Sequence, residues 1–310
     1  MRYIGGILLK EGYEKIGRTV GKLKENYNFR GLLHLTDFSN LNSIISIGYL
    51  LSRDLCYASN IEFFDAADEE SISAAPGKVK SYTRFYYTDR NNCSMEHKLN
   101  IPVYLLFNEE ILYLDSAIYS DGNADLRNTN FGTDFDFFNY DIDWEVVFSK
   151  KNVPESFDGP VQEEFFGKKQ AELLIDEPVP IKQLKNIIFR CNADYKRACN
   201  LFGKNKMFMV EPEMFVEAMN YLMDYNIVYN RLSDSDVFIF HFSSNEPVKN
   251  DDRHEYRLYD INDKLLRIAK VSFLESDSTD FHVEVENLPC LPVKFRFWFY
   301  GILCVEEIVG

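Results

Sequence analysis

The chain has 310 residues, of which 46% are hydrophobic, and its formal net charge is −15. This length and apolar content support one large domain or two ordinary ones with a buried core, and the acidic total argues against a protein that binds nucleic acid by overall charge. The sequence shows neither a signal peptide nor an apolar run long enough to cross a membrane, so we expect a cytoplasmic protein without a membrane partner.

Cysteine and histidine spacing gives no sign of a metal site. The six cysteines form no C-x-x-C pair, and the five histidines form no H-E-x-x-H pattern. We therefore expect free thiols and no metal.

Charge is distributed unevenly along the chain. The segment 107–143 is strongly acidic, whereas 178–206 is basic, with Asp194 as its one acid. Its bases are Lys182, Lys185, Arg190, Lys196, Arg197, Lys204 and Lys206. This run indicates either a basic face on an acidic protein or an ordinary solvated face.

The first half of the chain begins with a compact strand and helix. A strand is predicted over 32–35, followed by a helix with apolar residues at helical spacing that Gly48 ends and that Ser39 or Asn40 caps. The runs RFYYT and IPVYLLFN have the aromatic and β-branched content of strands.

Further strands are predicted before residue 190. Alternation of acids with aromatic residues indicates a strand over 144–148, and a loop follows it. The run KKQAELLIDEPVPIKQLKNIIFR begins as a strand, continues as a helix between Ile181 and Leu184, and ends as a strand over 187–189.

The pattern changes from Glu211 onward. The segment EPEMFVEAMNYLMDYN predicts a helix with Pro212 in its first turn. Alternating runs after it, VFIFHFS, EYRLYDI, LLRIAKVSFL, FHVEVENL and VKFRFWFYGILCVEEI, predict an antiparallel sheet. We therefore divide the chain into domains 1–206 and 207–310.

Three separated motifs carry the strongest functional information. The first is H-x-T followed by N-L-x-S-I-x-x-x-G, from His34 to Gly48; the second is F-Y-Y-x-x-R, from Phe85 to Arg90; the third is Q-A-E-L-L-I, from Gln170 to Ile175. In this order they resemble the DarT family of DNA-targeting ADP-ribosyltransferases, over roughly half of the chain.

The resemblance implies a fold and a co-substrate. We expect an α+β protein with an ADP-ribosyltransferase-like split sheet, mostly antiparallel, and NAD in its cleft, joined to the C-terminal helix and antiparallel β region. A Rossmann dehydrogenase is disfavoured because the sequence lacks a G-x-G-x-x-G unit.

Glu172 is the candidate catalytic carboxylate. Cleavage of the nicotinamide glycosidic bond develops positive charge on the ribose, which a nearby carboxylate stabilises. The resemblance adds a role in deprotonating the attacking base, which a raised pKa favours. The alternative is a polar residue of an alternating strand.

The other motif residues are predicted to bind NAD. His34 offers a ring nitrogen to a ribose hydroxyl, and Asn40 either caps the helix or reaches NAD. Arg90 grips the pyrophosphate or assists at the transferred ribose as a catalytic residue, unless it is an exposed surface arginine. The complete cofactor-binding set is His34, Thr36, Asn40, Gly48 and Tyr86.

The second motif departs from the family pattern. The family has V-P-F-Y-F and R-S-P-M, whereas this chain has T-R-F-Y-Y, with Arg84 in place of the proline and two residues inserted before Ser94. This departure concerns the identity of the acceptor more than the use of NAD.

In the family, the residues before the catalytic glutamate form a loop that reads the substrate, which here is Val161–Lys169. Aromatic side chains in this loop can stack on a base and lysines can meet phosphates, or the aromatic pair simply anchors the loop in the core. The predicted substrate-binding residues are Phe165, Phe166, Lys168, Lys169 and Gln170.

The leading function is NAD-dependent mono-ADP-ribosylation of a base in single-stranded DNA. The family implies a bacterial toxin or phage-defence effector restrained by a cognate antitoxin protein. The alternatives are an RNA ADP-ribosyltransferase and, from another class, an inactive nucleic-acid or NAD-binding module. The region 207–310 is predicted to recognise a partner or the acceptor, unless it only completes the core.

Overall fold

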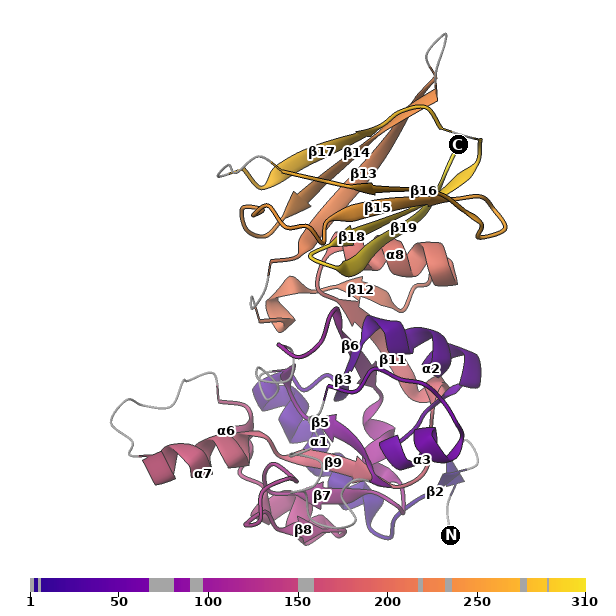
Figure 1. Cartoon of the computed structure of the whole chain (residues 1–310). Coiled ribbons are helices and arrows are strands. Elements are labelled where there is room, and N and C mark those ends of the chain that lie inside the picture. The colour runs from indigo at the N-terminus through magenta and orange to yellow at the C-terminus, as the bar shows by residue number, and fades with distance from the viewer. Residues whose placement is uncertain are drawn as a thin grey trace. The chain divides into compact units, whose positions relative to one another are not determined.

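A computed structural model describes residues 3–4, 7–66, 81–89, 97–149, 159–216, 220–231, 236–273, 278–288 and 290–310. Contacts divide the chain into two compact units, Met1–Ile187 and Ile188–Gly310 (Figure 1). Helix α8 (Asn192–Phe202) thus belongs to the second unit, whereas the sequence division at 206/207 assigned it to the first domain.

One large sheet organises the first unit. Its eight strands follow one another in the order β12, β11, β6, β3, β5, β9, β7, β8, where β12 is Phe208–Val210. The others are β3 (Leu32–Asp37), β5 (Thr83–Tyr86), β6 (Pro102–Phe107), β7 (Ile118–Ser120), β8 (Phe131–Gly132), β9 (Glu172–Ile175) and β11 (Leu184–Phe189). The ladders β3–β6, β3–β5, β5–β9 and β9–β7 are antiparallel. A single registered pair, Leu33 with Tyr86, joins β3 to β5, so this ladder has the fewest registered pairs of the four.

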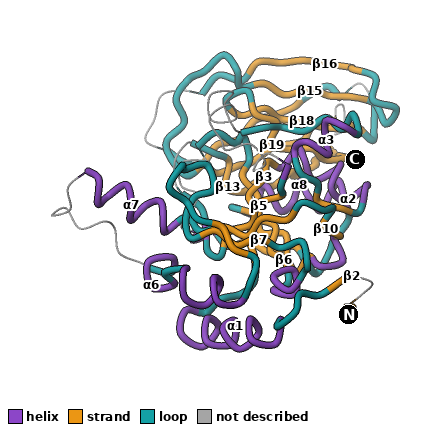
Figure 2. Tube along the Cα trace, turned by 90° about the horizontal axis from the view of Figure 1, so that it is seen from below, coloured by secondary structure: helices purple, strands orange, loops and turns teal. Residues whose placement is uncertain are grey.

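Short helices and strands surround this sheet (Figure 2). Helix α1 (Tyr13–Tyr27) buries Ile16, Val20 and Leu23 on one face, as its amphipathic sequence requires. The other elements are β1 (Tyr3–Ile4), β2 (Ile7–Leu8), η1 (Phe38–Asn40), α2 (Leu41–Ile47), β4 (Tyr49–Leu50), α3 (Arg53–Ala58), η4 (Glu109–Tyr113), η5 (Phe137–Asp141), α6 (Trp144–Val147), α7 (Gly159–Lys169), β10 (Val179–Pro180) and η6 (Ile181–Gln183).

Local sequence signals predicted several of these elements correctly. Strands β3, β5, β6, β9 and β11 lie where their runs predicted them. Gly48 ends α2 in the left-handed conformation, with φ of 80°, as predicted. Asn40 precedes α2, but its side chain makes no capping hydrogen bond in the described structure. Asp37 instead caps the preceding turn η1 by accepting from the backbone N–H of Ser39.

The strand predicted over 144–148 is wrong, because Trp144–Val147 form helix α6. The Asp143 side chain accepts a hydrogen bond from the backbone N–H of Val146 at 3.1 Å, which stabilises a helical turn. The alternation of acids and aromatics therefore reflected a capped helix rather than a strand.

Two antiparallel sheets form most of the second unit. Their strand orders are β13-β14-β17 and β16-β15-β18-β19. The elements after α8 are β12 (Phe208–Val210), η7 (Pro212–Met214), β13 (Leu222–Arg231), β14 (Asp236–Ser244), β15 (Glu255–Tyr259), β16 (Leu265–Lys270), β17 (Asp280–Val285), β18 (Val293–Phe299) and β19 (Ile302–Val309). The predicted antiparallel strands are confirmed.

The helix predicted over Glu211–Asn226 is wrong. Pro212–Met214 form a single 3-10 turn, and Leu222–Asn226 begin strand β13, which pairs with β14 along its length. Leu222 and Tyr225 join the buried core of the unit. This long-range pairing overrides a local apolar spacing that also fits a helix.

Aromatic side chains fill the core of the second unit. Phe238 and Phe240 from one sheet meet Phe295 and Phe297 from the other, with the Phe240 and Phe297 ring centroids 4.9 Å apart. On β18, Val293, Phe295, Phe297 and Phe299 are buried. Alternation along a strand directs the residues between them to the opposite face of the sheet.

Candidate active site

Glu172 is the first residue of β9 and is 1% exposed. Its backbone N–H donates to Ser120 Oγ at 2.9 Å, and its Oε2 accepts from the backbone N–H of Ala124 at 3.3 Å. Burial raises the pKa of the Glu172 carboxyl to about 7; the Arg84 charge opposes this rise, and the Asp125 charge adds to it. A carboxyl with this pKa can exchange a proton near neutral pH.

Arg84 on β5 lies between two carboxylates. Its Nη1 and Nη2 contact the two oxygens of Asp125 at 2.7 and 2.6 Å, whereas Nη1 is 4.0 Å from Glu172 Oε2. Because this contact is bidentate, the guanidinium pairs with Asp125 rather than with Glu172. This explains why the pKa of Glu172 stays raised with an arginine nearby.

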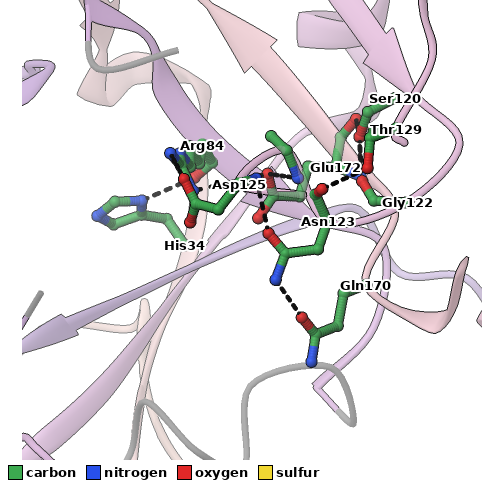
Figure 3. A network of polar contacts seen from close by, with 10 residues as sticks. His34, Arg84, Ser120, Gly122, Asn123, Asp125, Thr129, Gln170 and Glu172 are labelled. Atoms are coloured by element: carbon green, nitrogen blue, oxygen red, sulfur yellow. Dashed lines mark hydrogen bonds and ion pairs between the residues drawn. The ribbon is translucent and has the colours of Figure 1, made fainter. Parts of the chain in front are cut away.

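His34 on β3 contacts the same arginine through its backbone (Figure 3). The His34 Nδ1 lies 2.9 Å from the Arg84 carbonyl oxygen. Because a carbonyl only accepts, Nδ1 carries the hydrogen, and in the neutral ring Nε2 is an acceptor. Burial lowers the pKa of His34, which favours this neutral form.

The loop 121–130 holds Asp125 in place. Asn123 anchors it, because its backbone N–H donates to the Gly167 carbonyl at 2.9 Å and its side-chain amide donates to Gln170 Oε1. Asn123 Oδ1 in turn accepts from the backbone N–H of Asp125 at 2.9 Å. A Cβ on Gly122 would lie 3.0 Å from the Gly167 carbonyl oxygen, so a larger residue there would displace that carbonyl by a few tenths of an ångström.

Figure 3 shows the resulting network from Ser120 to Gln170 around Glu172. Gln170 was predicted to bind substrate, and in the structure its side-chain oxygen accepts from Asn123. The network therefore joins the end of α7, the loop 121–130 and the start of β9.

Thr36 and Asn40 are both buried beside the first turn after β3. The Asn40 amide donates to Thr36 Oγ1 and to the Phe64 carbonyl, each at 3.0 Å, and its oxygen accepts from the Phe64 backbone N–H at 2.7 Å. Asn40 thus holds the segment at Phe64 against β3. Gly48 has a similar connecting position, since its carbonyl accepts from the Ile181 backbone N–H at 3.0 Å.

Tyr86 lies directly beside the candidate catalytic carboxylate. It is the registered partner of Glu172 between β5 and β9, and its side chain makes a hydrogen bond that opposes the raised pKa of Glu172. Arg90, the other predicted catalytic residue, lies outside the described residues.

The predicted loop Val161–Lys169 is instead part of helix α7. Glu164 and Lys168 form an ion pair of 2.7 Å one turn apart, an arrangement that supports a helix. Phe166 is 51% exposed, Phe165 is partly buried, and Lys169 is the last helical residue. Figures 1 and 2 show α7 to the side of the sheet, and neither phenylalanine is among the buried core residues.

Sequence reasoning missed Arg84 and Asp125. Arg84 was read as a departure from the family pattern, although its spacing of two from Tyr86 on a strand puts both on one face. Asp125 carries no comparable signal. Its pairing with Arg84 depends on folding of the loop 121–130, and it was counted within an acidic run.

The basic run at 178–206 does not form a free basic face. Acidic side chains lie within 4.0 Å of Lys185, Arg190, Lys196 and Arg197. Within the part of the chain that the structure describes, no group of three or more His, Cys, Asp or Glu side chains is placed to hold a metal ion. No helix there has the length and apolarity of a membrane span.

Comparison with known families identifies the class of protein: the chain is similar to ADP-ribosyltransferases. The family model described as ssDNA thymidine ADP-ribosyltransferase, DarT, matches residues 33–217. This chain therefore belongs to the DarT family. Its predicted fold class and its enzyme class, an ADP-ribosyltransferase that uses NAD, are confirmed.

One of the similar solved structures, the first of the two that follow, shows the same fold at low sequence identity. Thermosipho africanus DarTG in complex with ADP-ribose has a TM-score of 0.51 and 15% identity over 60% of this chain and 51% of that one. Thermus sp. 2.9 DarT in complex with ADP-ribosylated ssDNA has a TM-score of 0.49 and 15% identity over 61% of this chain and 100% of that one. No curated protein gives a significant match.

Proposed function

We propose that this protein transfers ADP-ribose from NAD to the base of thymidine in single-stranded DNA. Family membership supports the reaction class and the acceptor. The observation that carries the proposal is the buried Glu172 carboxyl, which lies beside Tyr86 and Arg84 with its pKa raised to about 7.

The first step breaks the bond between nicotinamide and C1′ of its ribose. The bonding electrons leave with nicotinamide, and positive charge grows on the ribose. Glu172 in its ionised form stabilises that charge, and burial strengthens the interaction because water screens it less. The neutral His34 ring orients the ribose by accepting a hydroxyl hydrogen at Nε2.

The second step joins the base to the ribose. A thymine ring nitrogen forms the new bond to C1′, and its proton passes to the Glu172 carboxylate, which later releases it to water. The products are the ADP-ribosylated base, nicotinamide and one proton. A carboxyl with a pKa of about 7 accepts this proton more readily than an ordinary glutamate.

The remaining predicted residues have supporting roles in this proposal. Thr36, Asn40, Gly48 and Tyr86 shape the NAD site, and Arg90 contacts the NAD pyrophosphate or the transferred ribose. Helix α7 faces the acceptor with the exposed ring of Phe166 and the charge of Lys168, because it leads directly into Gln170 and Glu172.

The acceptor must be single-stranded, since a base nitrogen that is paired in a duplex cannot reach C1′. Modification of DNA bases is toxic to the cell that makes the enzyme. We therefore propose a toxin or phage-defence effector that a cognate antitoxin protein restrains.

The test is an incubation of the full chain with NAD labelled in its adenylate part and separate pools of single-stranded DNA, RNA and protein. We expect label on DNA with the wild type and none with Glu172→Gln. Label on RNA in place of DNA would establish the RNA alternative. NAD binding without hydrolysis or transfer would establish the inactive binding module.

A further inference from the structure

The outer face of the second sheet in the second unit is unusual in composition. On β18 the inward residues are buried, and the outward ones are Lys294, Arg296 and Trp298. Their registered partners on β15 are Tyr259, Arg257 and Glu255, and Glu255 is in turn opposite Lys270 on β16. We call the following six residues the basic aromatic face: Arg257, Tyr259, Lys270, Lys294, Arg296 and Trp298.

Arginine and aromatic side chains stack across this face. The Arg257 guanidinium lies 4.5 Å from the centre of the Trp298 ring, and the Arg296 guanidinium lies 4.7 Å from the centre of the Tyr259 ring. Arg257 and Arg296 also stand directly opposite each other in register. Like charges in this position repel, and the pairs that Arg257 makes with Glu255 and that Arg296 makes with Glu306, its registered partner on β19, offset this repulsion.

Cations exceed carboxylates on this face. Glu255 is shared by Arg257 and Lys270, and its distance to Lys270 is 2.9 Å. Asp263 is shared by Lys294 at 2.7 Å and Arg296 at 3.4 Å. Glu306 is shared by Arg296 at 3.0 Å and by Arg197 of α8 at 2.9 Å. Apart from Arg197, which belongs to α8, four cations of the face share these three carboxylates, in a chain whose net charge is −15.

The side chains are accessible to a ligand. Lys270 is 61% exposed and Arg257 is 36% exposed, while Arg296 and Lys294 are partly exposed. Contact with the Trp298 and Tyr259 rings restrains the two guanidinium groups, which lowers the entropy lost when a ligand binds.

We propose that the basic aromatic face binds a single-stranded nucleic acid, and that this strand is the acceptor; the second part rests on the proposed function. Phosphates meet the excess cations, and bases stack on guanidinium planes and aromatic rings. An acidic peptide would use the cations but not the stacks, so the composition favours nucleic acid. The face lies outside residues 33–217 that the family model matches.

The experiment measures binding of fluorescein-labelled oligothymidylate to the full chain carrying Glu172→Gln, without NAD, so that no transfer occurs. In this background Arg296→Gln removes one stacked cation and Trp298→Leu removes one ring. Arg253→Gln is the matched control, because Arg253 is an exposed arginine of the same unit that pairs with Asp251 at 2.6 Å and lies near the Tyr300 ring.

We expect Trp298→Leu and Arg296→Gln each to weaken binding about tenfold, and Arg296→Gln to reduce the salt dependence of log Kd by about one. Arg253→Gln should change affinity less than twofold. Equal affinity for all three variants, or competition by polyglutamate as strong as by unlabelled oligonucleotide, would overturn the inference.

A second measurement covers variants that fail to fold. Oligonucleotide containing 5-bromodeoxyuridine is crosslinked by light to the wild-type chain, and the modified peptides are sequenced. Crosslinks within 255–259 or 293–299 support the inference, and crosslinks confined to other segments contradict it. Crosslinking of RNA in preference to DNA within these two segments would support nucleic-acid binding by the basic aromatic face. It would contradict the DNA acceptor of the proposed function.

Discussion

The Glu172 site and the basic aromatic face use the same residue types in opposite proportions. Around Glu172, two carboxylates share one arginine, Arg84, and one of the two, Glu172 itself, is buried. On the outer sheet face, four cations share three carboxylates and stay at least partly exposed. An excess of buried acid raises a carboxyl pKa, and an excess of exposed base attracts phosphate. Local charge balance, rather than the total of −15, therefore decides what each region can do.

The largest expected effect concerns the Glu172 site, where carboxylates outnumber cations. Glu172→Gln should reduce ADP-ribose transfer by on the order of 10³-fold, because the amide neither stabilises the ribose cation nor accepts a proton. Transfer is measured by incorporation of labelled NAD into oligothymidylate. Glu145→Gln, at an exposed glutamate of α6, should leave the rate unchanged. A folded Glu172→Gln protein with the wild-type rate would remove Glu172 from the mechanism.

The same buried carboxyl should cost stability at high pH. Its folded pKa of about 7 exceeds its ordinary value of 4.5, so between these values the folded protein binds more protons than the unfolded chain. Stability from this group therefore falls as pH rises through that window, by on the order of 2–3 kcal/mol. Urea unfolding at pH of about 5 and about 8 should show that Glu172→Gln gains stability over the wild type at the higher pH. An equal difference at both pH values would argue against a raised pKa.

A smaller effect is expected at Asp125, which diverts Arg84 from Glu172. In Asp125→Asn the guanidinium is free to pair with Glu172, and a negative charge is lost, so the pKa of Glu172 should fall. The acidic limb of the pH–rate profile should then move to lower pH, with a plateau rate reduced about tenfold because the base is weaker. Asp121→Asn, in the same loop, should leave the limb in place. A limb that stays at the wild-type position in Asp125→Asn would show that Asp125 does not tune Glu172.

The smallest expected effect concerns α7. Phe166→Ala should lower transfer to oligothymidylate about fivefold, because one base loses a stacking partner, while hydrolysis of NAD by water is spared. Both rates are followed in one assay by separating modified DNA from free ADP-ribose. Equal loss of both would mean that Phe166 supports the NAD site rather than the acceptor.

Sequence patterns predicted the parts of the molecule that are encoded locally. The turn from β3 into α2 ends at Gly48 as predicted, and Glu172 begins a strand as its motif indicated. The failures have nonlocal causes. Leu222 fits a helix locally but belongs to a strand because β14 pairs with it, and Arg84 gains its position from Asp125, a residue 41 positions away.

The most direct test of the central claim is the pH dependence of kcat/KM for transfer from NAD to oligothymidylate by the wild-type chain. If the buried Glu172 carboxylate accepts the proton of the base, the logarithm of the rate should rise with unit slope and level off near pH 7. A profile that levels off near 4.5, the ordinary value for glutamate, would contradict the claim, as would absence of transfer to DNA at every pH at which NAD is hydrolysed.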